Sequence, residues 1–218
     1  MKRLIIVCEG PTEQEFCKEV LYPYFLQFDI LVEFPVIKKS GGGIITWEPL
    51  KRQLRNHLFE EGTYVTMLVD YYRLKDPKRI PGWVESTCIA DKQERIHFLF
   101  ERMKLDMDEV LQSRFIPYIQ LHEFESLLFS DIAPYREYFA LNNSRYDRLN
   151  HIINSFPNPE MINEGPTTAP SKRLIDIIPE YNKVLDGGIL AIALGLETIR
   201  NRCPLFNEWI SNLEKIVN

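Results

Sequence analysis

The spacing of apolar residues changes repeatedly along roughly the first 125 positions, which predicts strands separated by helices. The unbroken apolar run at residues 4–8 is typical of a parallel strand that is covered on both faces, and residues 63–69 are also predicted to form a strand. Residues 30–37 are expected to form the second strand along the chain, at a sheet edge because Pro35 cannot donate to a ladder, which makes residues 63–69 the third strand and residues 115–121 the fourth. Right-handed crossovers between successive strands would make this sheet parallel.

Helical spacing predicts the segments between the strands. Apolar residues recur every three or four positions over residues 47–58, and Asp91 has the character of a helix N-cap. Beyond Asp131 the pattern is helical, with no further strand and with Gly187 and Gly188 as punctuation. We therefore expect an α/β fold with a central, mainly parallel four-stranded sheet and a helical C-terminal cover.

Length and composition bound this picture. A chain of 218 residues with 45% hydrophobic content can bury one substantial core. We expect residues 1–130 to form that α/β core and residues 131–218 to form a helical extension packed on it. The net charge of −5 argues against bulk attraction to nucleic acid, so a polyanion would have to be held by local cations or by a metal ion.

Compartment signals point to a cytoplasmic protein without a membrane segment. No apolar run approaches the roughly 20 residues that cross a bilayer, and no basic-then-apolar leader indicates export. The four cysteines show no paired metal-ligand spacing, and we interpret them as reduced thiols.

Acidic residues follow the first predicted strand. Glu9 stands at its carboxyl end, the edge at which open α/β sheets bind ligands. Thr12 and Glu15 have the spacing of a capping box, which would begin a helix at or beside Thr12 and place Glu13 in its first turn. The Gly-Pro turn can fold Glu13 back toward Glu9, and two close carboxylates repel unless a cation lies between them. Helix capping alone is the simpler alternative for both acids.

Two further strand ends carry acids. Asp70 follows the third strand, and Glu123 or Glu125 follows the fourth, so parallel strands would bring these groups to one edge. Asp70 could equally terminate its strand as a turn residue, and Glu125 could face solvent or pair with Arg136. His122 is interpreted as structural, because no second histidine stands at the spacing of a zinc motif.

The ordered motifs resemble a known family. Glu9-Gly-x-x-Glu13 after a first strand, and Asp70 after a third, resemble the acidic signature of the Toprim fold of topoisomerases, bacterial primases and overcoming-lysogenization-defect nucleases. The wider set resembles an uncharacterised bacterial Toprim-like family, related to those nucleases, whose genes often lie beside ATPase genes in phage-defence settings. The motifs of that set are Glu9-Gly-Pro-Thr-Glu13, Val69-Asp70-x-Tyr72, His122-Glu-Phe-Glu125, Pro170-Ser-Lys-Arg-Leu174 and Phe206-Asn-Glu-Trp209.

This resemblance implies a metal-dependent nuclease that acts on DNA or RNA, with an ATPase as a protein partner. Carboxylates would hold Mg²⁺ or Mn²⁺, and a lysine would stabilise developing charge. By position, Glu9, Glu13 and Asp70 would be metal ligands, Glu9 and Lys172 catalytic groups, and Glu125 a substitute ligand. The chain departs from the usual Asp-x-Asp, because Asp70 is followed by two tyrosines.

Basic residues near these motifs are candidates for binding a nucleic-acid backbone, with a solvated loop or helix start as the plain alternative. Gly41–Gly43 could cradle a phosphate but lacks the Lys-Ser/Thr ending of a P-loop. The candidate nucleic-acid-binding residues are Arg73, Lys75, Lys78, Arg79 and Arg173.

Two other functions remain open from sequence. The chain could be a binding or regulatory module that kept the fold and lost the reaction, which the missing second aspartate favours. It could also be another α/β phosphoryl-transfer enzyme with Asp70 as nucleophile, although such enzymes commonly need a second acid that this chain lacks.

Overall fold

The structure is a computed structural model that describes residues 2–38, 46–74, 80–163, 165 and 167–217. Gly41–Gly43 and the basic residues Lys75, Lys78 and Arg79 lie outside the described residues, as does the side chain of Arg73. The predictions made for those side chains and for the glycine loop therefore stay predictions.

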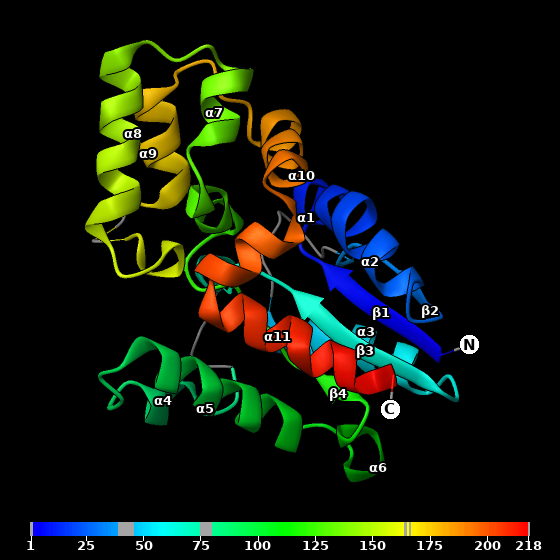
Figure 1. Cartoon of the computed structure of the whole chain (residues 1–218). Helices are drawn as coiled ribbons and strands as arrows, with labels where there is room; N and C mark the ends of the chain where they lie inside the picture. Colours follow the sequence, from blue (N-terminus) through cyan, green and yellow to red (C-terminus); the bar gives the residue numbers. More distant parts are fainter. Residues whose placement is uncertain (1, 39–45, 75–79, 164, 166, 218) are drawn as a thin grey trace.

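A four-stranded parallel sheet forms the centre of the molecule, as predicted (Figure 1). Its strands are ordered β2-β1-β3-β4, so the segment with Pro35 does lie at an edge. β4 is much shorter than expected: the ladder ends at Ile116, because Pro117 has no N–H to donate, and pairing returns only as a single bridge between Asp70 and Gln120. The strand bounds are β1 Lys2–Cys8, β2 Ile30–Glu33, β3 Thr63–Leu68 and β4 Phe115–Ile116.

Helices cover both faces of the sheet, which explains why β1 is an unbroken apolar run. Leu4 and Ile6 point into a core shared with α1, α2, α10 and α11, whereas Ile5 and Val7 point into a core shared with α3 and α5. The bounds are α1 Pro11–Phe16, α2 Tyr22–Leu26, α3 Trp47–Leu58, α4 Trp83–Ser86, α5 Lys92–Leu105, α6 Glu109–Gln112, α10 Lys183–Arg202 and α11 Pro204–Glu214.

The start of α1 lies beside Thr12 and Glu13 lies in its first turn, as predicted, but the predicted capping box does not form. Gly10 is the N-cap and Pro11 the first helical residue, so Thr12 lies inside the helix and no side chain caps it. Proline is pre-organised for the first helical position, and it fixes the start one residue before the Thr12 box. Glu15 is exposed and lies 3.8 Å from Lys18.

The chain after residue 131 is helical, and the described part of it contains no strand. α7, α8 and α9 gather at one end of the molecule, away from the strands (Figure 1). α11 lies on the sheet itself, where the Trp209 ring stacks on Tyr118 at 4.4 Å and its Nε1 donates to Thr66 Oγ1 at 2.9 Å. The predicted division at residue 130 stays a prediction. The remaining bounds are α7 Ala133–Tyr138, α8 Asn143–Ser155 and α9 Pro170–Ile177, with short helices η1 Cys17–Leu21, η2 Tyr71–Arg73, η4 Phe124–Ser130, η5 Pro159–Met161 and η6 Lys215–Val217.

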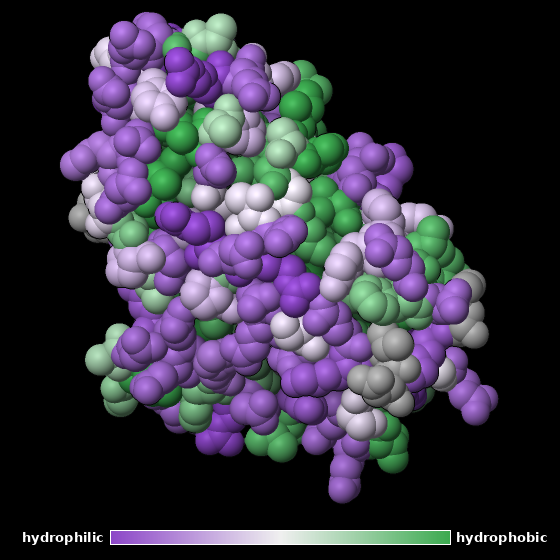
Figure 2. All heavy atoms as spheres, viewed as in Figure 1, coloured by the Kyte–Doolittle hydropathy of each residue, from purple (hydrophilic) through white to green (hydrophobic). Residues whose placement is uncertain are grey.

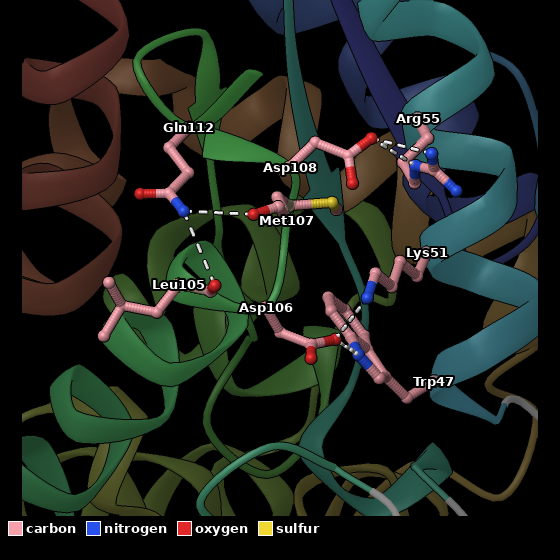
Figure 3. Close-up of polar contacts among 8 residues, drawn as sticks. All are labelled: Trp47, Lys51, Arg55, Leu105, Asp106, Met107, Asp108 and Gln112. Carbon is pink, nitrogen blue, oxygen red and sulfur yellow. Dashed lines mark hydrogen bonds and ion pairs between the residues drawn. The ribbon is translucent and has the colours of Figure 1, made fainter. Parts of the chain in front are cut away.

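On the other face of the sheet, two aspartates hold α3 against the end of α5 (Figure 3). Asp106, at the end of α5, accepts from Trp47 Nε1 at 2.7 Å and from Lys51 Nζ at 2.8 Å. Asp108 binds Arg55 one turn further along α3. These contacts fix α3 against the turn between α5 and α6.

Polar residues dominate the view over α11, α4 and α5, whereas apolar residues gather along α10 (Figure 2). Val184, Leu185 and Ile192 of α10 are among the exposed large hydrophobic residues. Within the described residues, none of the helices combines the length and apolar character needed to cross a membrane. All four cysteines are free thiols.

Gly187 and Gly188 do not punctuate the helical region as expected but lie inside α10, which packs along α1. A Cβ on Gly187 would stand 3.1 Å from Thr12 Cγ2 and 3.2 Å from the Tyr181 hydroxyl. The backbone of α10 can therefore approach α1 closely. The non-helical residue of this segment is Gly195, with φ of 73°.

We expect Gly187→Val to lower the free energy of unfolding by about 1–3 kcal/mol, because its side chain overlaps Thr12 and Tyr181. Gly188→Ala is the matched control, since its Cβ would meet Glu15 Cγ at an ordinary 3.5 Å, and it should stabilise the fold by about 0.4–1 kcal/mol. Urea unfolding measures both. Equal effects of the two substitutions would contradict close packing at Gly187.

Candidate active site at the carboxyl edge of the sheet

Glu9 and Asp70 meet at the carboxyl ends of β1 and β3. Cys8 and Leu68 are paired in register, and the Glu9 N–H donates to the Leu68 carbonyl at 3.0 Å. The Glu9 side chain then folds across to β3, where its Oε2 accepts the Asp70 N–H at 3.0 Å. Glu9 is 7% exposed and Asp70 is 1% exposed. The structure thus brings these two predicted acids together.

Asp70 is held by the segment that follows β4. Its Oδ1 accepts the Phe124 N–H at 2.7 Å, which links β3 to the start of η4. Burial raises the pKa of Asp70 well above its ordinary value, and the charges of Glu9 and Glu13 raise it further. This carboxyl group is therefore hard to ionise unless a cation is near.

Glu13 lies over Gly10 in the first turn of α1. A Cβ on Gly10 would stand 3.4 Å from Glu13 Oε2, so glycine leaves room for the carboxylate. Glu13 is buried, and desolvation followed by the charge of Glu9 raises its pKa. Interaction with the helix dipole does not explain this burial, because an acid in the first turn stabilises a helix even when it is exposed to water.

Glu125 completes the group from η4. It is fully buried, its Oε2 accepts from Lys183 Nζ at 2.9 Å, and its Oε1 has no hydrogen-bond partner among the described residues. Burial raises its pKa, while Lys183 opposes that effect. Glu125 therefore neither faces solvent nor pairs with Arg136, which were the two simpler interpretations. We call Glu9, Glu13, Asp70 and Glu125 the carboxylate cluster.

Lys183 is the lysine beside the cluster, and sequence reasoning missed it. Burial alone would lower the pKa of Lys183, but the carboxylates of Glu125 and Asp70 raise it above its ordinary value. It is the first residue of α10, where the helix dipole disfavours a cation, so the neighbouring carboxylates have to stabilise its charge. The predicted Lys172 is exposed and lines a hollow with Arg148 and Asp176 instead.

The remaining candidate residues lie outside the carboxylate cluster, and the nucleic-acid role of Arg173 stays a prediction. Glu123 Oε2 accepts the Ser171 N–H at 3.0 Å and so anchors the start of α9. Arg173 donates through Nε to the Thr168 carbonyl, and its guanidinium lies 5.3 Å from the Phe156 ring. His122 has a φ of 70° and is buried, which lowers its pKa to about 4 and keeps the ring neutral near pH 7.

The cluster has the right donors for a hard divalent cation, although its oxygens are otherwise engaged. Within the described ranges, no three His, Cys, Asp or Glu side chains stand in an arrangement that could hold a metal ion. Glu9 and Asp70 accept backbone N–H groups, and Lys183 occupies Glu125 Oε2. Four carboxyl groups stand beside one ammonium, so a further cation would favour the ionised forms that burial opposes, and the orphaned Glu125 Oε1 is a spare oxygen ligand.

Comparison with known proteins places the chain in a family. Residues 8–214 match the family described as "Domain of unknown function (DUF4276)". No curated protein matches the chain. Among solved structures, the C-terminal region of the Burkholderia pseudomallei OLD protein is similar, with 14% identity, a TM-score of 0.49 and all of both chains covered. The C-terminal region of the Xanthomonas campestris pv. campestris OLD protein is similar at 18% identity and a TM-score of 0.49, over 100% of this chain and 95% of that chain.

We expect Lys183→Met to lower the free energy of unfolding by about 2–4 kcal/mol, because it leaves Glu125 buried without its cation; partial exposure of Lys183 keeps the loss below that of a fully buried pair. The double variant Lys183→Met with Glu125→Leu should recover most of that stability. Chemical denaturation of the four proteins in the cycle measures the coupling. Additive losses would show that the pair does not stabilise the fold.

Proposed function

The chain belongs to the DUF4276 family, and we propose that it is a divalent-metal-dependent nuclease that hydrolyses phosphodiester bonds of DNA or RNA at the carboxylate cluster. The observation that carries this proposal is the burial of four acids beside one lysine, with Glu9 and Asp70 at the ends of β1 and β3, Glu13 in α1 and Glu125 in η4. A fold gains no stability from such a group, because apolar side chains would fill the same space at lower cost. Perturbed carboxyl groups gathered at the ligand-binding edge of a parallel sheet are the pattern of a reactive site.

Glu9, Glu13, Asp70 and Glu125 would hold Mg²⁺ or Mn²⁺, which favour oxygen ligands. When bound, the ion supplies Lewis-acid polarisation of a phosphate oxygen and a more acidic water. Two further roles belong to groups of the chain itself: orientation of the metal ligands, and stabilisation of negative charge by Lys183. Backbone N–H groups of Asp70 and Phe124 orient the Glu9 and Asp70 carboxylates, so these two ligands are already held at the sheet edge, whereas Glu13 and Glu125 would have to move toward them to complete a metal site.

Lys183 is the group placed to stabilise negative charge. Its ammonium bonds Glu125 at 2.9 Å and is two-thirds buried, so it can donate to a phosphate oxygen where water is largely excluded. In this proposal Lys183 takes the role that the sequence resemblance implied for Lys172. An ATPase partner and a phage-defence setting belong to the proposal through that resemblance alone.

One observation favours a second candidate, a binding or regulatory module without catalysis. Tyr72 stands where an Asp-x-Asp motif would have its second aspartate. In addition, no three described side chains are arranged to hold a metal ion. A third possibility, Asp70 as the nucleophile of a phosphoryl transfer, is disfavoured because Asp70 is 1% exposed and its Oδ1 is occupied by the Phe124 N–H.

Asp70→Asn tests the proposal without disturbing the backbone contacts, because the amide oxygen can still accept the Phe124 N–H. We expect it to lower Mn²⁺ affinity and nuclease activity by about 100-fold or more, since a neutral amide is a poor ligand in place of a carboxylate. Titration calorimetry with Mn²⁺ and cleavage of plasmid, single-stranded RNA and tRNA measure the two effects.

Glu15→Gln is the matched control for Glu13→Gln. Both residues lie on α1 and lose the same charge, but Glu15 is exposed and Glu13 is buried. Only the Glu13 variant should lose activity and metal binding. Metal binding without cleavage of any substrate would favour the regulatory module, and a wild-type protein that binds no Mn²⁺ at millimolar concentration would end the proposal.

The affinity for Mn²⁺ should rise with pH. Burial and mutual repulsion raise the pKa values of Glu13, Asp70 and Glu125, so protons compete with the metal in mild acid. Each proton released on binding adds up to about one decade of affinity per pH unit. Titrations between about pH 5.5 and about pH 8 measure the slope, and Asp70→Asn should flatten it. A flat profile in the wild-type protein would place the metal elsewhere.

A further inference from the structure

A second cavity begins where the carboxylate cluster ends. Tyr71 and Tyr72 directly follow Asp70, and both line a cleft of about 330 Å³, within the size range of small-ligand sites. None of the described residues that line it is acidic, although the chain carries a net charge of −5. We call it the aromatic cleft, and its principal lining residues are Tyr71, Tyr72, Lys92, Arg95, His122 and Asn163.

Aromatic rings line the cleft in two pairs. Tyr71 stacks on Trp83 with ring centroids 5.2 Å apart and an interplanar angle of 26°, and the Arg95 guanidinium lies 5.0 Å from the Trp83 ring. Tyr72 lies 5.3 Å from the His122 ring at 30°. Tyr71 is half-buried by this packing, whereas Tyr72 is 46% exposed. Tyr72 therefore offers an accessible ring surface to a planar ligand.

A buried hydrogen-bond donor stands at the wall of the cleft. Asn163 Oδ1 accepts the Gly165 N–H at 2.8 Å, which orients the Asn163 amide so that its Nδ2 donates to His122 Nδ1 at 3.2 Å. His122 Nδ1 is thus the acceptor, and its hydrogen lies on Nε2. That Nε2 is buried and has no partner among the described residues, and His122 itself is 5% exposed. Nε2 has no accessible surface, so a ligand in the cleft does not reach it, and His122 contributes its neutral ring, which lies beside Tyr72.

Two cations complete the lining from one face of α5. Lys92 and Arg95 are three positions apart, so their side chains lie on the same side of the first helical turn. Lys92 has no ion pair with a carboxylate in the part of the chain that the structure describes. Arg95 donates to Ser86 Oγ at 3.2 Å, which leaves the other guanidinium donors for an anion.

We propose that the aromatic cleft binds a nucleoside phosphate, with the base against Tyr72 and the phosphate at Lys92 and Arg95. Planar π-systems beside cations are how proteins hold single-stranded nucleic acid without reading its sequence. Because Asp70 and Tyr71 are adjacent, a strand in the cleft would continue toward the carboxylate cluster. This inference rests on the proposed function only for that continuation. A free nucleotide and a nucleotide within a strand share the recognised chemistry.

The test measures binding in EDTA, where no metal-dependent cleavage occurs. Fluorescein-labelled single-stranded DNA and RNA of about 12 nucleotides, and an abasic strand of equal length, are titrated with the full chain by fluorescence anisotropy. Lys92→Gln combined with Arg95→Gln should weaken binding about 10-fold or more and reduce the salt slope by about 0.7 for each cation lost. Tyr72→Ala should weaken binding of the base-bearing strands about 5- to 150-fold and leave the abasic strand unchanged.

Two matched variants separate the cleft from general effects. Lys104→Gln removes one positive charge from the other end of α5, as each of Lys92→Gln and Arg95→Gln does from the cleft, and it should leave affinity unchanged. Tyr72→Phe keeps the ring but loses the hydroxyl that contacts Asn163, and it should bind within about twofold of wild type. Circular dichroism and thermal unfolding confirm that each variant folds.

Competition by AMP assigns the source of the ligand. If AMP displaces the strand at concentrations near the strand's own dissociation constant, the ligand is a free nucleotide. If AMP displaces the strand only at higher concentrations, the ligand is a strand. Both outcomes support the cleft. Equal affinity for abasic and base-bearing strands, or equal losses in Lys104→Gln and the Lys92/Arg95 pair, overturns it. If Asp70→Asn binds the strand in EDTA as well as the wild-type protein does, and the wild-type protein cleaves no substrate in Mn²⁺, the proposed function is wrong while the cleft stands.

Discussion

The structure depends on one hydrogen bond between neighbouring strands, in which the Glu9 carboxylate after β1 accepts a backbone N–H at the end of β3. Glu9 accepts the Asp70 N–H, and this bond exists only because β1 and β3 are parallel and in register from Arg3 to Cys8. A shift of one residue would turn every β1 side chain to the opposite face and separate the two acids. The packing of both helical layers therefore determines the chemistry at the sheet edge. Leu4 and Ile6 fix that register from one side, and Ile5 fixes it from the other.

Desolvation is the cost that this arrangement carries. An ionised carboxylate loses several kcal/mol on transfer to the interior, and a single ion pair rarely compensates for more than one such group. Lys183 is bonded to Glu125 and acts on Asp70 and Glu13 only through its charge. The cluster is therefore under-neutralised, which is the condition for strong binding of a further cation. It is also the condition for a group whose proton occupancy responds to its surroundings.

The sequence was most informative for features that a single strand or helix determines through its own local pattern. The aliphatic run of β1 and the position of Glu9 follow from local patterns, as do the N-cap Asp91 and the edge position of Pro35. Errors arose where local rules compete. At α1 the predicted capping box at Thr12 does not form. The helix begins at Pro11 instead, because proline fits the first helical position without any side-chain bond.

Other features could not be read from sequence because they arise from contacts between distant segments. Lys183 meets Glu125 across 58 positions, and nothing near either residue specifies the other. Gly187 indicated a break by composition, yet it serves the approach of α10 to α1, which outweighs the low helix propensity of glycine. The convergence of Glu9, Asp70 and Glu125 was foreseeable from parallel strands, and that of Glu13 from the Gly-Pro turn, whereas the cation that accompanies them was not.

The position of Lys183 also joins the two halves of the chain. The acids Glu9, Glu13 and Asp70 belong to the first 70 residues, whereas the ammonium among them begins α10 near the other end of the chain. Docking of the helical region is thus an electrostatic event as well as an apolar one. Any movement of α10 away from α1 would withdraw the positive charge and leave the acids to repel one another. A ligand or protein that shifts α10 would consequently change how strongly the sheet edge attracts cations, without touching that edge.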